Sequence, residues 1–470
     1  MQRFIYWCLA LLATAQISTL VTASTVNKEV LRTIDATSSI VRVTTEIKVT
    51  GASKEYLYVV PTDSAKHIAY IGGKAKGIKT PLEISPPEES TIGNYTQYRV
   101  KVQDANPTIK IITVLTDVLE PYPAEIFQLE RQLVKLVDSH YYYSMYPTSA
   151  QKTIFKLASS AVESYTRKVP HTSRGSTISM GPYLDVEPQA YSRCVVHYEN
   201  HAPFAKLKTV RTDIEVSHWG SVSVEEVIEL EHAGAKLKGG FSRFDYQMRR
   251  TEDSHSFRSL LAVLPGEATS IFYRDQIGNI SSSELRRVET EIEMEVQPRF
   301  PMFGGWKSQF YLGYRVPTES MLFIDPISGR YQLKFDFYTM FEDVWVGDLE
   351  VKLVLPEGCS DIKVELPSST TSSWTRRYTY LDSKLNGGRP VLILRGKNLV
   401  AELDSVVLVS YSFGASRILV EPCMLCATFF AFFCICSFIA RTSAVPKNDE
   451  VGLAGTDAAV ADKDKKTKAE

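Results

Sequence analysis

Two apolar segments at opposite ends of the chain limit what it can fold into more than any other feature. Residues 4–15 form an apolar run after Arg3, and the small-residue pattern Val21-Thr22-Ala23 follows. As a helix this run would span only about 18 Å, so residues 1–23 are predicted to be a cleaved signal peptide. Residues 423–440 carry no charged side chain. They would give about 27 Å of helix, enough to cross a bilayer.

The order of these segments predicts a type I single-pass membrane protein. The chain after the signal peptide would lie in the lumen, residues 418–440 would form the transmembrane helix, and residues 441–470 would form a short cytosolic tail. Glu421 lies at the start of the span, whereas Arg441 and Lys447 follow it. Positive charge is therefore on the predicted cytosolic side.

The carboxyl end resembles a localisation signal. Lys466 and Lys468 lie close to the final residue, Glu470. Their spacing resembles the dilysine signal that returns type I membrane proteins to the endoplasmic reticulum. The alternative is a solvated run of mixed charge, since acidic residues are interspersed in the same tail.

Composition narrows the class of protein. A formal net charge of −1 gives no basic footprint for nucleic acid, so we expect no nucleic-acid partner. With 44% hydrophobic and 23% charged residues, the chain resembles ordinary globular proteins. A lumenal part of this size exceeds what one core usually serves. We therefore predict two lumenal domains, residues 24–205 and 206–417.

Alternation of apolar and polar residues is the dominant pattern in the lumenal part. Strands with one apolar face are typical of antiparallel sheets packed face to face. The fold class predicted is therefore mainly β, with two lumenal antiparallel β-sandwich-like domains before a single transmembrane helix. Residues 128–138 suit either a helix or a strand. The alternating segments are residues 41–49, 292–296, 333–337, 351–355 and 362–366.

A weak internal repeat supports two domains. Leu31-Arg32-Thr33 and Val210-Arg211-Thr212 each precede an alternating strand that ends in Gly-Ala. This pattern predicts that both domains begin with the same strand pair, and it places the boundary near residue 205. The polar stretch 168–188 is then predicted to be a loop or the tail of the first domain.

Cysteine usage does not indicate a disulfide-built ectodomain. Only Cys194 and Cys359 would face the oxidising lumen, because the others lie in the signal peptide or the membrane span. These two could form a disulfide, but two separate buried thiols are the favoured interpretation.

No motif indicates catalysis, a cofactor or a metal. His197 and His201 have the spacing of two zinc ligands on a helix, but Glu199 is displaced from the zincin pattern and Pro203 discourages a helix. There is no nucleophile elbow and no phosphate-binding loop. Most acidic residues occupy the polar positions of strands, where a solvated sheet face explains them. We expect no catalytic, cofactor-binding or metal-binding residues.

Two further features concern the lumenal surface. Tyr141–Pro147 is an aromatic cluster that could hold a peptide or a glycan, although strand packing is the favoured explanation. Asn94 and Asn279 begin Asn-x-Ser/Thr sequences and are candidate glycosylation sites. Each must then lie on an exposed loop, and Asn279 is the better candidate because it follows a glycine in a turn-like sequence.

Several long blocks of the lumenal part resemble the ribophorin I family, in order along the chain. The longest are Pro298–Lys307, Phe241–Gln247 and Tyr273–Asn279. The other blocks are residues 196–200, 215–220, 355–358 and 378–382. The resemblance covers essentially the whole lumenal part and the span.

This resemblance implies a non-catalytic scaffold or substrate-presenting subunit of the oligosaccharyltransferase complex in the endoplasmic reticulum membrane. That complex transfers a preassembled oligosaccharide from dolichyl diphosphate to Asn in Asn-x-Ser/Thr of nascent proteins. The implied partners are the catalytic and other subunits, nascent polypeptides, the vicinity of the translocon and the lipid bilayer. Catalytic residues and their metal would belong to another subunit. Animal members carry a long cytosolic region near the ribosome, whereas residues 441–470 are short, which argues against direct ribosome contact.

Two alternatives remain at this point. A cell-surface receptor or adhesion protein built from β-sandwiches would leave the endoplasmic reticulum and carry complex-type glycans at Asn94 or Asn279. A membrane-bound lumenal hydrolase would need an acid/base pair of side chains in a pocket.

Overall fold

The structure is a computed structural model that describes most of the chain between Thr25 and Ser443. Within that range it does not describe residues 53, 78–79, 91–92, 103–106, 249–254, 368–369, 379–386 and 404–405. The predicted signal peptide and the lysines Lys466 and Lys468 lie outside the described residues.

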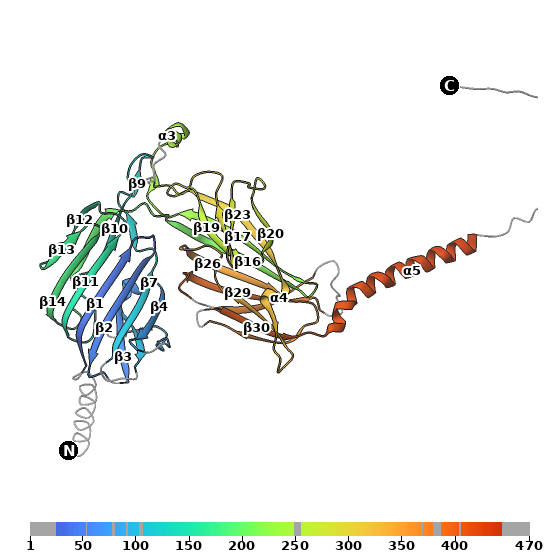
Figure 1. Cartoon of the computed structure of the whole chain (residues 1–470), viewed down its shortest axis with the longest axis horizontal. Helices are drawn as coiled ribbons and strands as arrows, with labels where there is room; N and C mark the ends of the chain where they lie inside the picture. The colour runs from blue at the N-terminus through green and yellow to red at the C-terminus, as the bar shows by residue number, and fades with distance from the viewer. Residues whose placement is uncertain are drawn as a thin grey trace, which may run out of the picture. The chain divides into compact units, whose positions relative to one another are not determined.

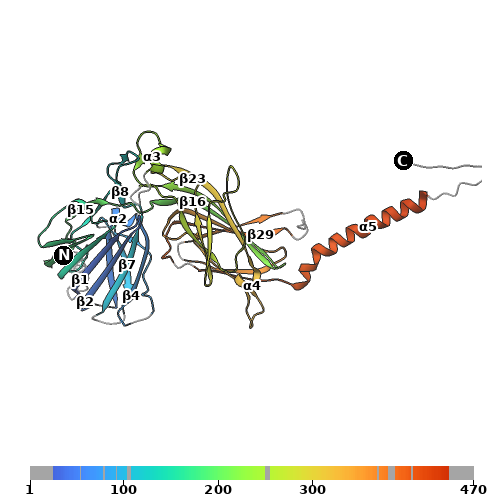
Figure 2. The ribbon, with the colours of Figure 1, turned by 45° about the horizontal axis from the view of Figure 1, so that its top comes forward.

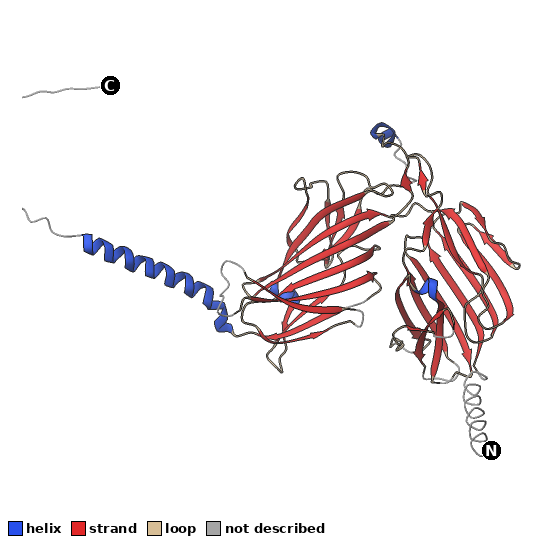
Figure 3. Cartoon of the chain, turned by 180° about the vertical axis from the view of Figure 1, so that it is seen from behind, coloured by secondary structure: helices blue, strands red, loops and turns tan. Residues whose placement is uncertain are grey.

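The described chain is mainly β, as predicted, and Figure 3 shows strands dominating everything before the last helix. We call residues 25–204 the first lobe and residues 205–414 the second lobe. The helices are α2 (Thr62–Ala65), α3 (Arg243–Met248), α4 (Thr318–Met321), the 3-10 helix η2 (Ala415–Leu419) and α5 (Val420–Ser443).

A seven-stranded sheet forms one side of the first lobe, in the order β13-β14-β11-β1-β2-β7-β4 (Figures 1 and 2). Two smaller sheets, β3-β6-β5 and β12-β15-β10-β8, pack on it. The strands of the large sheet are β1 (Val26–Ala36), β2 (Val41–Thr50), β4 (Ile68–Ala75), β7 (Thr108–Leu115), β11 (Thr148–Leu157), β13 (His171–Arg174) and β14 (Thr177–Val186). The others are β3 (Glu55–Pro61), β5 (Glu88–Glu89), β6 (Tyr95–Lys101), β8 (Leu119–Pro121), β10 (Leu133–Ser139), β12 (Val162–Tyr165) and β15 (Arg193–Glu199).

The second lobe has the same composition of sheets, with a seven-stranded sheet in the order β20-β23-β17-β16-β26-β29-β28. Its smaller sheets are β19-β22-β21 and β24-β25-β30-β27. The large sheet contains β16 (Ala205–Ser217), β17 (Ser221–His232), β20 (Thr269–Asp275), β23 (Lys307–Pro317), β26 (Trp345–Val354), β28 (Thr371–Arg377) and β29 (Arg389–Leu399). The others are β19 (Leu260–Pro265), β21 (Glu284–Val288), β22 (Glu291–Val296), β24 (Leu322–Ile324), β25 (Tyr331–Asp336), β27 (Ser360–Glu365) and β30 (Val406–Ser412).

The two lobes share one topology, strand for strand. Read in opposite directions, the two large sheets match from β4/β20 to β13/β28, and the smaller sheets match in the same way. The strand pair that opens each lobe, β1–β2 and β16–β17, is antiparallel in both. The internal repeat predicted from the sequence is confirmed by this order and extends through the whole of each lobe. Each large sheet also contains one parallel pair, β1–β11 and β16–β26, which the sequence did not predict.

The interiors of the two lobes differ. In the second lobe one continuous apolar cluster spans all three sheets. In the first lobe the two main apolar clusters are separate: one joins Ile34 and Val43 to β8, β10 and β15, and the other joins Val30 and Ile47 to β3 and β6. The large sheet of the first lobe therefore crosses from one core to another along β1 and β2.

Several contacts join the lobes. Strand β9 (Glu125–Ile126) pairs in parallel with β18 (Lys236–Leu237). Arg42 forms ion pairs with Asp343 at 2.8 Å and with Glu402. The chain up to Gly414 forms one compact unit, and the division into separate domains at residue 205 stays a prediction.

One sequence expectation for the first lobe was wrong. Residues 168–188 contain strands β13 and β14 rather than only a loop. Ile178 and Met180 on β14 are both fully buried and alternate with polar neighbours. This short alternation is masked in the sequence by the surrounding Gly, Pro and Ser. The ambiguous stretch 128–138 contributes strand β10.

The carboxyl-terminal unit begins at Ala415 and contains η2 and α5. Residues 416–442 are long and apolar enough to cross a membrane, and among the described residues this is the one such segment. Helix α5 carries Glu421 in its first turn and Arg441 in its last turn. This segment agrees with the prediction of a single membrane-crossing helix at residues 418–440.

Candidate functional site

A polar row interrupts the inner face of the large sheet in the first lobe. On β1 the inward positions are Val30, Arg32 and Ile34, so Arg32 lies between a residue of one core cluster and a residue of the other. Its partner across the β1–β2 pairing is Thr45, and its partner on β11 is Thr153. Both threonines are buried. The split between the two cores therefore coincides with this row.

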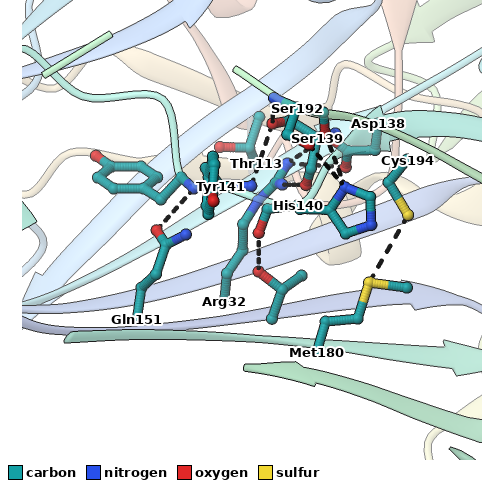
Figure 4. A network of polar contacts seen from close by, with 12 residues as sticks. Arg32, Thr113, Asp138, Ser139, His140, Tyr141, Gln151, Met180, Ser192 and Cys194 are labelled. Atoms are coloured by element: carbon teal, nitrogen blue, oxygen red, sulfur yellow. Dashed lines mark hydrogen bonds and ion pairs between the residues drawn. The ribbon is translucent and has the colours of Figure 1, made fainter. Parts of the chain in front are cut away.

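Arg32 is held by a nearly buried ion pair. Its Nη2 donates to both carboxylate oxygens of Asp138, at 3.0 and 2.9 Å, and its Nη1 donates to the carbonyl oxygen of Ser139 at 3.4 Å (Figure 4). The two side chains are only 15% and 18% exposed. Asp138 also accepts from the backbone N–H of Ser139 at 2.7 Å. This two-point contact from Nη2, together with the bond from Nη1 to Ser139, fixes the guanidinium group in one orientation.

The segment after Asp138 is fixed by polar contacts from β11 of the large sheet and from Ser192 and Thr166. The hydroxyl of Thr153 donates to the carbonyl oxygen of His140 at 3.2 Å, and the backbone N–H of Tyr142 donates to Gln151 at 2.9 Å. The His140 ring contacts the carbonyl oxygen of Ser192 at 3.0 Å (Figure 4). It also contacts the carbonyl oxygen of Thr166 at 3.1 Å. These bonds position the tyrosines that follow.

A cavity of about 390 Å³ lies between the two core clusters of the first lobe. Arg32 and Asp138 form part of its wall, together with apolar residues from both clusters and further polar residues such as Asp117 and Glu120. Five tyrosines belong to its lining. They are Tyr58, Tyr141, Tyr142, Tyr143 and Tyr191.

The carboxylates of this cavity largely have cationic partners. Asp138 is paired with Arg32, Glu120 with Lys135 at 3.0 Å, and Asp63 with Lys66 at 3.5 Å. A catalytic pair of carboxylates would have to exchange protons with a substrate. Carboxylates held in ion pairs are better suited to binding a ligand than to this acid/base catalysis.

The aromatic cluster predicted at Tyr141–Pro147 contains both a packing residue and residues of the cavity lining. Tyr142 is buried, and its hydroxyl lies 3.4 Å from that of Tyr56, so it is a packing residue that also touches the cavity. Burial raises the pKa of Tyr142 well above its usual range. Tyr143 is only partly buried, and its ring lies 6.4 Å from that of Tyr95. Packing, the favoured explanation, is therefore confirmed for Tyr142, and ligand binding by the cluster stays a prediction.

The two glycosylation candidates both lie at exposed positions. Asn94 precedes β6, and its carbonyl oxygen accepts a bond from Thr62 at 3.2 Å. Asn279 follows the turn after β20 and forms an isolated bridge with Arg274. Both asparagines are therefore exposed, as a glycosylation site requires. Whether they carry glycans stays a prediction.

Cys194 and Cys359 are both free thiols in the structure. Cys194 belongs to a core cluster of the first lobe and lies 3.8 Å from the sulfur of Met180. Cys359 packs against the core of the second lobe. Burial raises the pKa of Cys194 to about 12 and that of Cys359 to about 11, so both stay protonated at neutral pH.

The histidine pair considered for zinc does not converge. His197 lies on β15, and its Nε2 contacts the carbonyl oxygen of Tyr122 at 2.9 Å. His201 lies beyond the strand and contacts Glu199 at 2.6 Å. Among the described residues no group of three or more His, Cys, Asp or Glu side chains could hold a metal ion.

Arg32 was not among the site residues predicted from the sequence, although the sequence carries a signal for it. Arg32 interrupts the apolar series Val30, Ile34 and Ala36, all of which are buried on one face of β1. A charged residue at an inward position requires a buried partner. That partner, Asp138, is distant in sequence and is brought close by strand β10.

The fold and the cavity define a class of protein: two β lobes of one topology, one of them with a surface cavity of mixed polar and apolar lining, followed by an apolar helix. A sequence model of the family Ribophorin I matches residues 25–440. The chain belongs to the ribophorin I family.

Curated relatives carry a consistent name. Subunit 1B of dolichyl-diphosphooligosaccharide–protein glycosyltransferase from Arabidopsis thaliana is 38% identical over 86% of this chain and 89% of its own length. Subunit 1A from the same plant is 37% identical over 92% of this chain and 73% of its own length. Subunit 1 from Caenorhabditis elegans is 37% identical over 87% of this chain and 71% of its own length.

Solved structures show only partial likeness. An M1 zinc metallopeptidase from Deinococcus radiodurans is 9% identical, covers 44% of this chain and 42% of its own, and aligns with a TM-score of 0.26. A likeness this low supports no conclusion about fold or chemistry.

Proposed function

We propose that this chain is a non-catalytic subunit of an oligosaccharyltransferase complex and supports the transfer of an oligosaccharide from dolichyl diphosphate to Asn in Asn-x-Ser/Thr. The observation that carries the proposal is the 37–38% identity to relatives named as subunit 1, extending over at least 86% of this chain. The matching family region also continues through most of helix α5.

The division of labour is part of the proposal. The catalytic residues and their metal belong to another subunit, and this chain contributes structure and substrate presentation. The ion-paired lining of the cavity supports this assignment, because Asp138 and Glu120 are already held by cations.

We further propose that the chain resides in the endoplasmic reticulum membrane with both lobes in the lumen. The charge difference between Glu421 and Arg441 at the ends of α5 supports this orientation. Protease added to sealed microsomes should leave residues 25–414 intact and remove the carboxyl-terminal tail. Digestion of the lobes in sealed vesicles would contradict the orientation.

Assembly is proposed to involve helix α5 in the membrane. Large side chains such as Phe429 and Phe433 are exposed along it, and Ala427 and Ala431 leave room for close approach of another helix. The partners are then the catalytic and other membrane subunits, with nascent polypeptides and the translocon nearby.

Membership is tested by affinity purification of the tagged full chain from membranes in a mild detergent. The catalytic subunit should co-purify with it. A matched control carries an unrelated apolar helix of equal length in place of residues 416–442 and should recover less of the catalytic subunit. Recovery of the intact chain without any glycan-transfer subunit would contradict the proposal.

The curated relatives give no support to the receptor alternative. That alternative predicts passage to the cell surface, so glycans at Asn94 or Asn279 would become resistant to endoglycosidase H. Persistent sensitivity is expected here, because a resident of the endoplasmic reticulum does not meet the later processing enzymes.

A further inference from the structure

The cavity of the first lobe is a specific feature of that lobe and not a consequence of its topology. Arg32 and Thr45 occupy the positions that Thr212 and Glu226 occupy in the second lobe. In the second lobe the corresponding strands belong to one continuous core. In the first lobe the core divides at this row, and a cavity of about 390 Å³ lies there, within the range of small-ligand sites.

The two least exposed charged side chains of the cavity, Arg32 and Asp138, neutralise each other's charge. Arg32 and Asp138 form a two-point pair with both side chains largely buried. A charged ligand group would have to compete with this pair for one of its members. An uncharged ligand can instead accept from the remaining N–H groups of Arg32 without separating the charges.

Aromatic rings supply the other part of the lining. Tyr141, Tyr143 and Tyr191 line the cavity and are at least partly accessible. The apolar C–H face of a pyranose ring packs well on such rings, while its hydroxyl groups need polar partners around its edge. Tyrosine offers both an apolar face and a hydroxyl.

Carboxylates stand at the exposed edge of the cavity. Asp117 lies in the cavity lining at the surface, in a left-handed backbone conformation with φ of 57°, and Asp63 lies in α2. Carboxylate oxygens accept bonds from the neighbouring hydroxyl groups of a sugar.

We propose that this cavity binds a neutral oligosaccharide, taking a pyranose ring between the tyrosines with its hydroxyl groups on Asp117 and the Arg32–Asp138 pair. The inference rests on the proposed function only for the biological source of the oligosaccharide. The compensated charges favour this ligand over a basic peptide, which would bind mainly to the carboxylates at the edge.

The glycan could come from two sources, one of them this chain. Asn94 accepts a backbone bond from Thr62, which stands between the cavity-lining residues Pro61 and Asp63. Its neighbour Tyr95 contacts Tyr143 of the cavity. A glycan on Asn94 would therefore begin at the rim. The other source is a glycan presented by another molecule.

The test measures binding of fluorescently labelled neutral oligosaccharides of mannose, glucose or N-acetylglucosamine to the purified complex. At least one series should bind, and Tyr143→Ala should weaken that binding roughly tenfold. Asp117→Asn keeps an acceptor oxygen and tolerates the left-handed backbone, so it should weaken binding less than Asp117→Ala. Tyr122→Ala, which changes an exposed tyrosine outside the cavity, should leave affinity unchanged.

Two further arms identify the ligand class and its source. Binding of a neutral glycan should not change between low and high salt, whereas a lysine-rich peptide should bind weakly or lose affinity steeply as salt rises. In Asn94→Gln, stronger binding of the added probe would show that the chain's own glycan occupies the cavity. Unchanged binding would assign the cavity to glycans of other molecules.

The inference is overturned if no probe binds to either the wild-type chain or Asn94→Gln, if Tyr143→Ala and Tyr122→Ala bind alike, or if only the basic peptide binds. Each sample is also analysed for the catalytic subunit. A complex that retains this subunit but binds no oligosaccharide refutes the cavity assignment and leaves the proposed function standing. Loss of the subunit from the wild-type preparation refutes the proposed function instead.

Discussion

Arg32 on β1 and Thr212 on β16 occupy the same position in two lobes of identical strand order. The ladder irregularities after Asn27 and Leu207 align the two strands, so that both residues face inward. Arg32 pairs with Asp138, whereas Thr212 donates to the buried carboxyl of Glu226 at 3.4 Å. Both members of this strand pair therefore differ between the lobes, since Thr45 faces Arg32 where Glu226 faces Thr212.

Removing one member of the Arg32–Asp138 pair should destabilise the first lobe. Arg32→Met leaves the Asp138 carboxylate without its cation, at an expected cost of about 2–4 kcal/mol in the free energy of unfolding. Urea unfolding of the full chain measures this change. Arg395→Met removes a surface partner of Glu350 and should cost less than about 1 kcal/mol. Equal effects of the two substitutions would contradict a structural role for the pair.

Glu226 should make stability depend on pH in a defined direction. Burial raises its pKa from 4.5 to about 7, although hydrogen bonds from Thr339 and Thr212 oppose this shift. The folded state then holds a proton that the unfolded state has released. Stability is therefore highest below pH 4.5 and falls until about pH 7, by on the order of 3 kcal/mol.

Glu226→Gln provides the measurement, because the amide mimics the protonated carboxyl and does not titrate. His232, whose pKa burial lowers to about 4, changes stability in the opposite direction in both proteins, so the difference between variant and wild type isolates Glu226. That difference should grow in favour of the variant between pH 4.5 and 7. A difference that is constant with pH would show that Glu226 is ionised when folded.

The two lumenal cysteines should react only after unfolding. Their burial and raised pKa values leave little thiolate for alkylation. Iodoacetamide should label both Cys194 and Cys359 in denaturant without a reductant, and neither in the native protein. A need for reductant before labelling would instead show that they form the disulfide considered from the sequence.

Asn94 and Asn279 should each carry a glycan. Asn94→Gln and Asn279→Gln should each increase gel mobility by one glycan, and the double substitution by two, without loss of the protein. Endoglycosidase H should remove the remaining shift. Unchanged mobility for either substitution would mean that the site is unoccupied despite its exposure.

The large elements of the fold were accessible from alternation alone. Residues 41–49 and 292–296 lie in β2 and β22, and residues 351–354 of the predicted segment 351–355 lie in β26. The β1–β11 and β16–β26 parallel pairs were not accessible, because a strand's own pattern does not state which distant strand lies beside it.

The sequence match between the two lobes is shifted by one residue relative to the alignment given by the strand pairings. The sequence match set Arg32 against Arg211, but the strand pairings set it against Thr212. A shift of one residue exchanges the two faces of a strand. The matched arginines therefore point to opposite sides, which concealed Arg32 as an inward charge and left the cavity unpredicted.

Glycan occupancy in cells depleted of this chain tests the central proposal most directly. Mass spectrometry of Asn-x-Ser/Thr sites should show lower occupancy, with some glycoproteins affected more than others, since substrate presentation acts on effective concentration. The full chain should restore occupancy, and the chain with residues 416–442 replaced by an unrelated helix should restore less. Unchanged occupancy at every site after depletion would contradict a role in N-glycosylation.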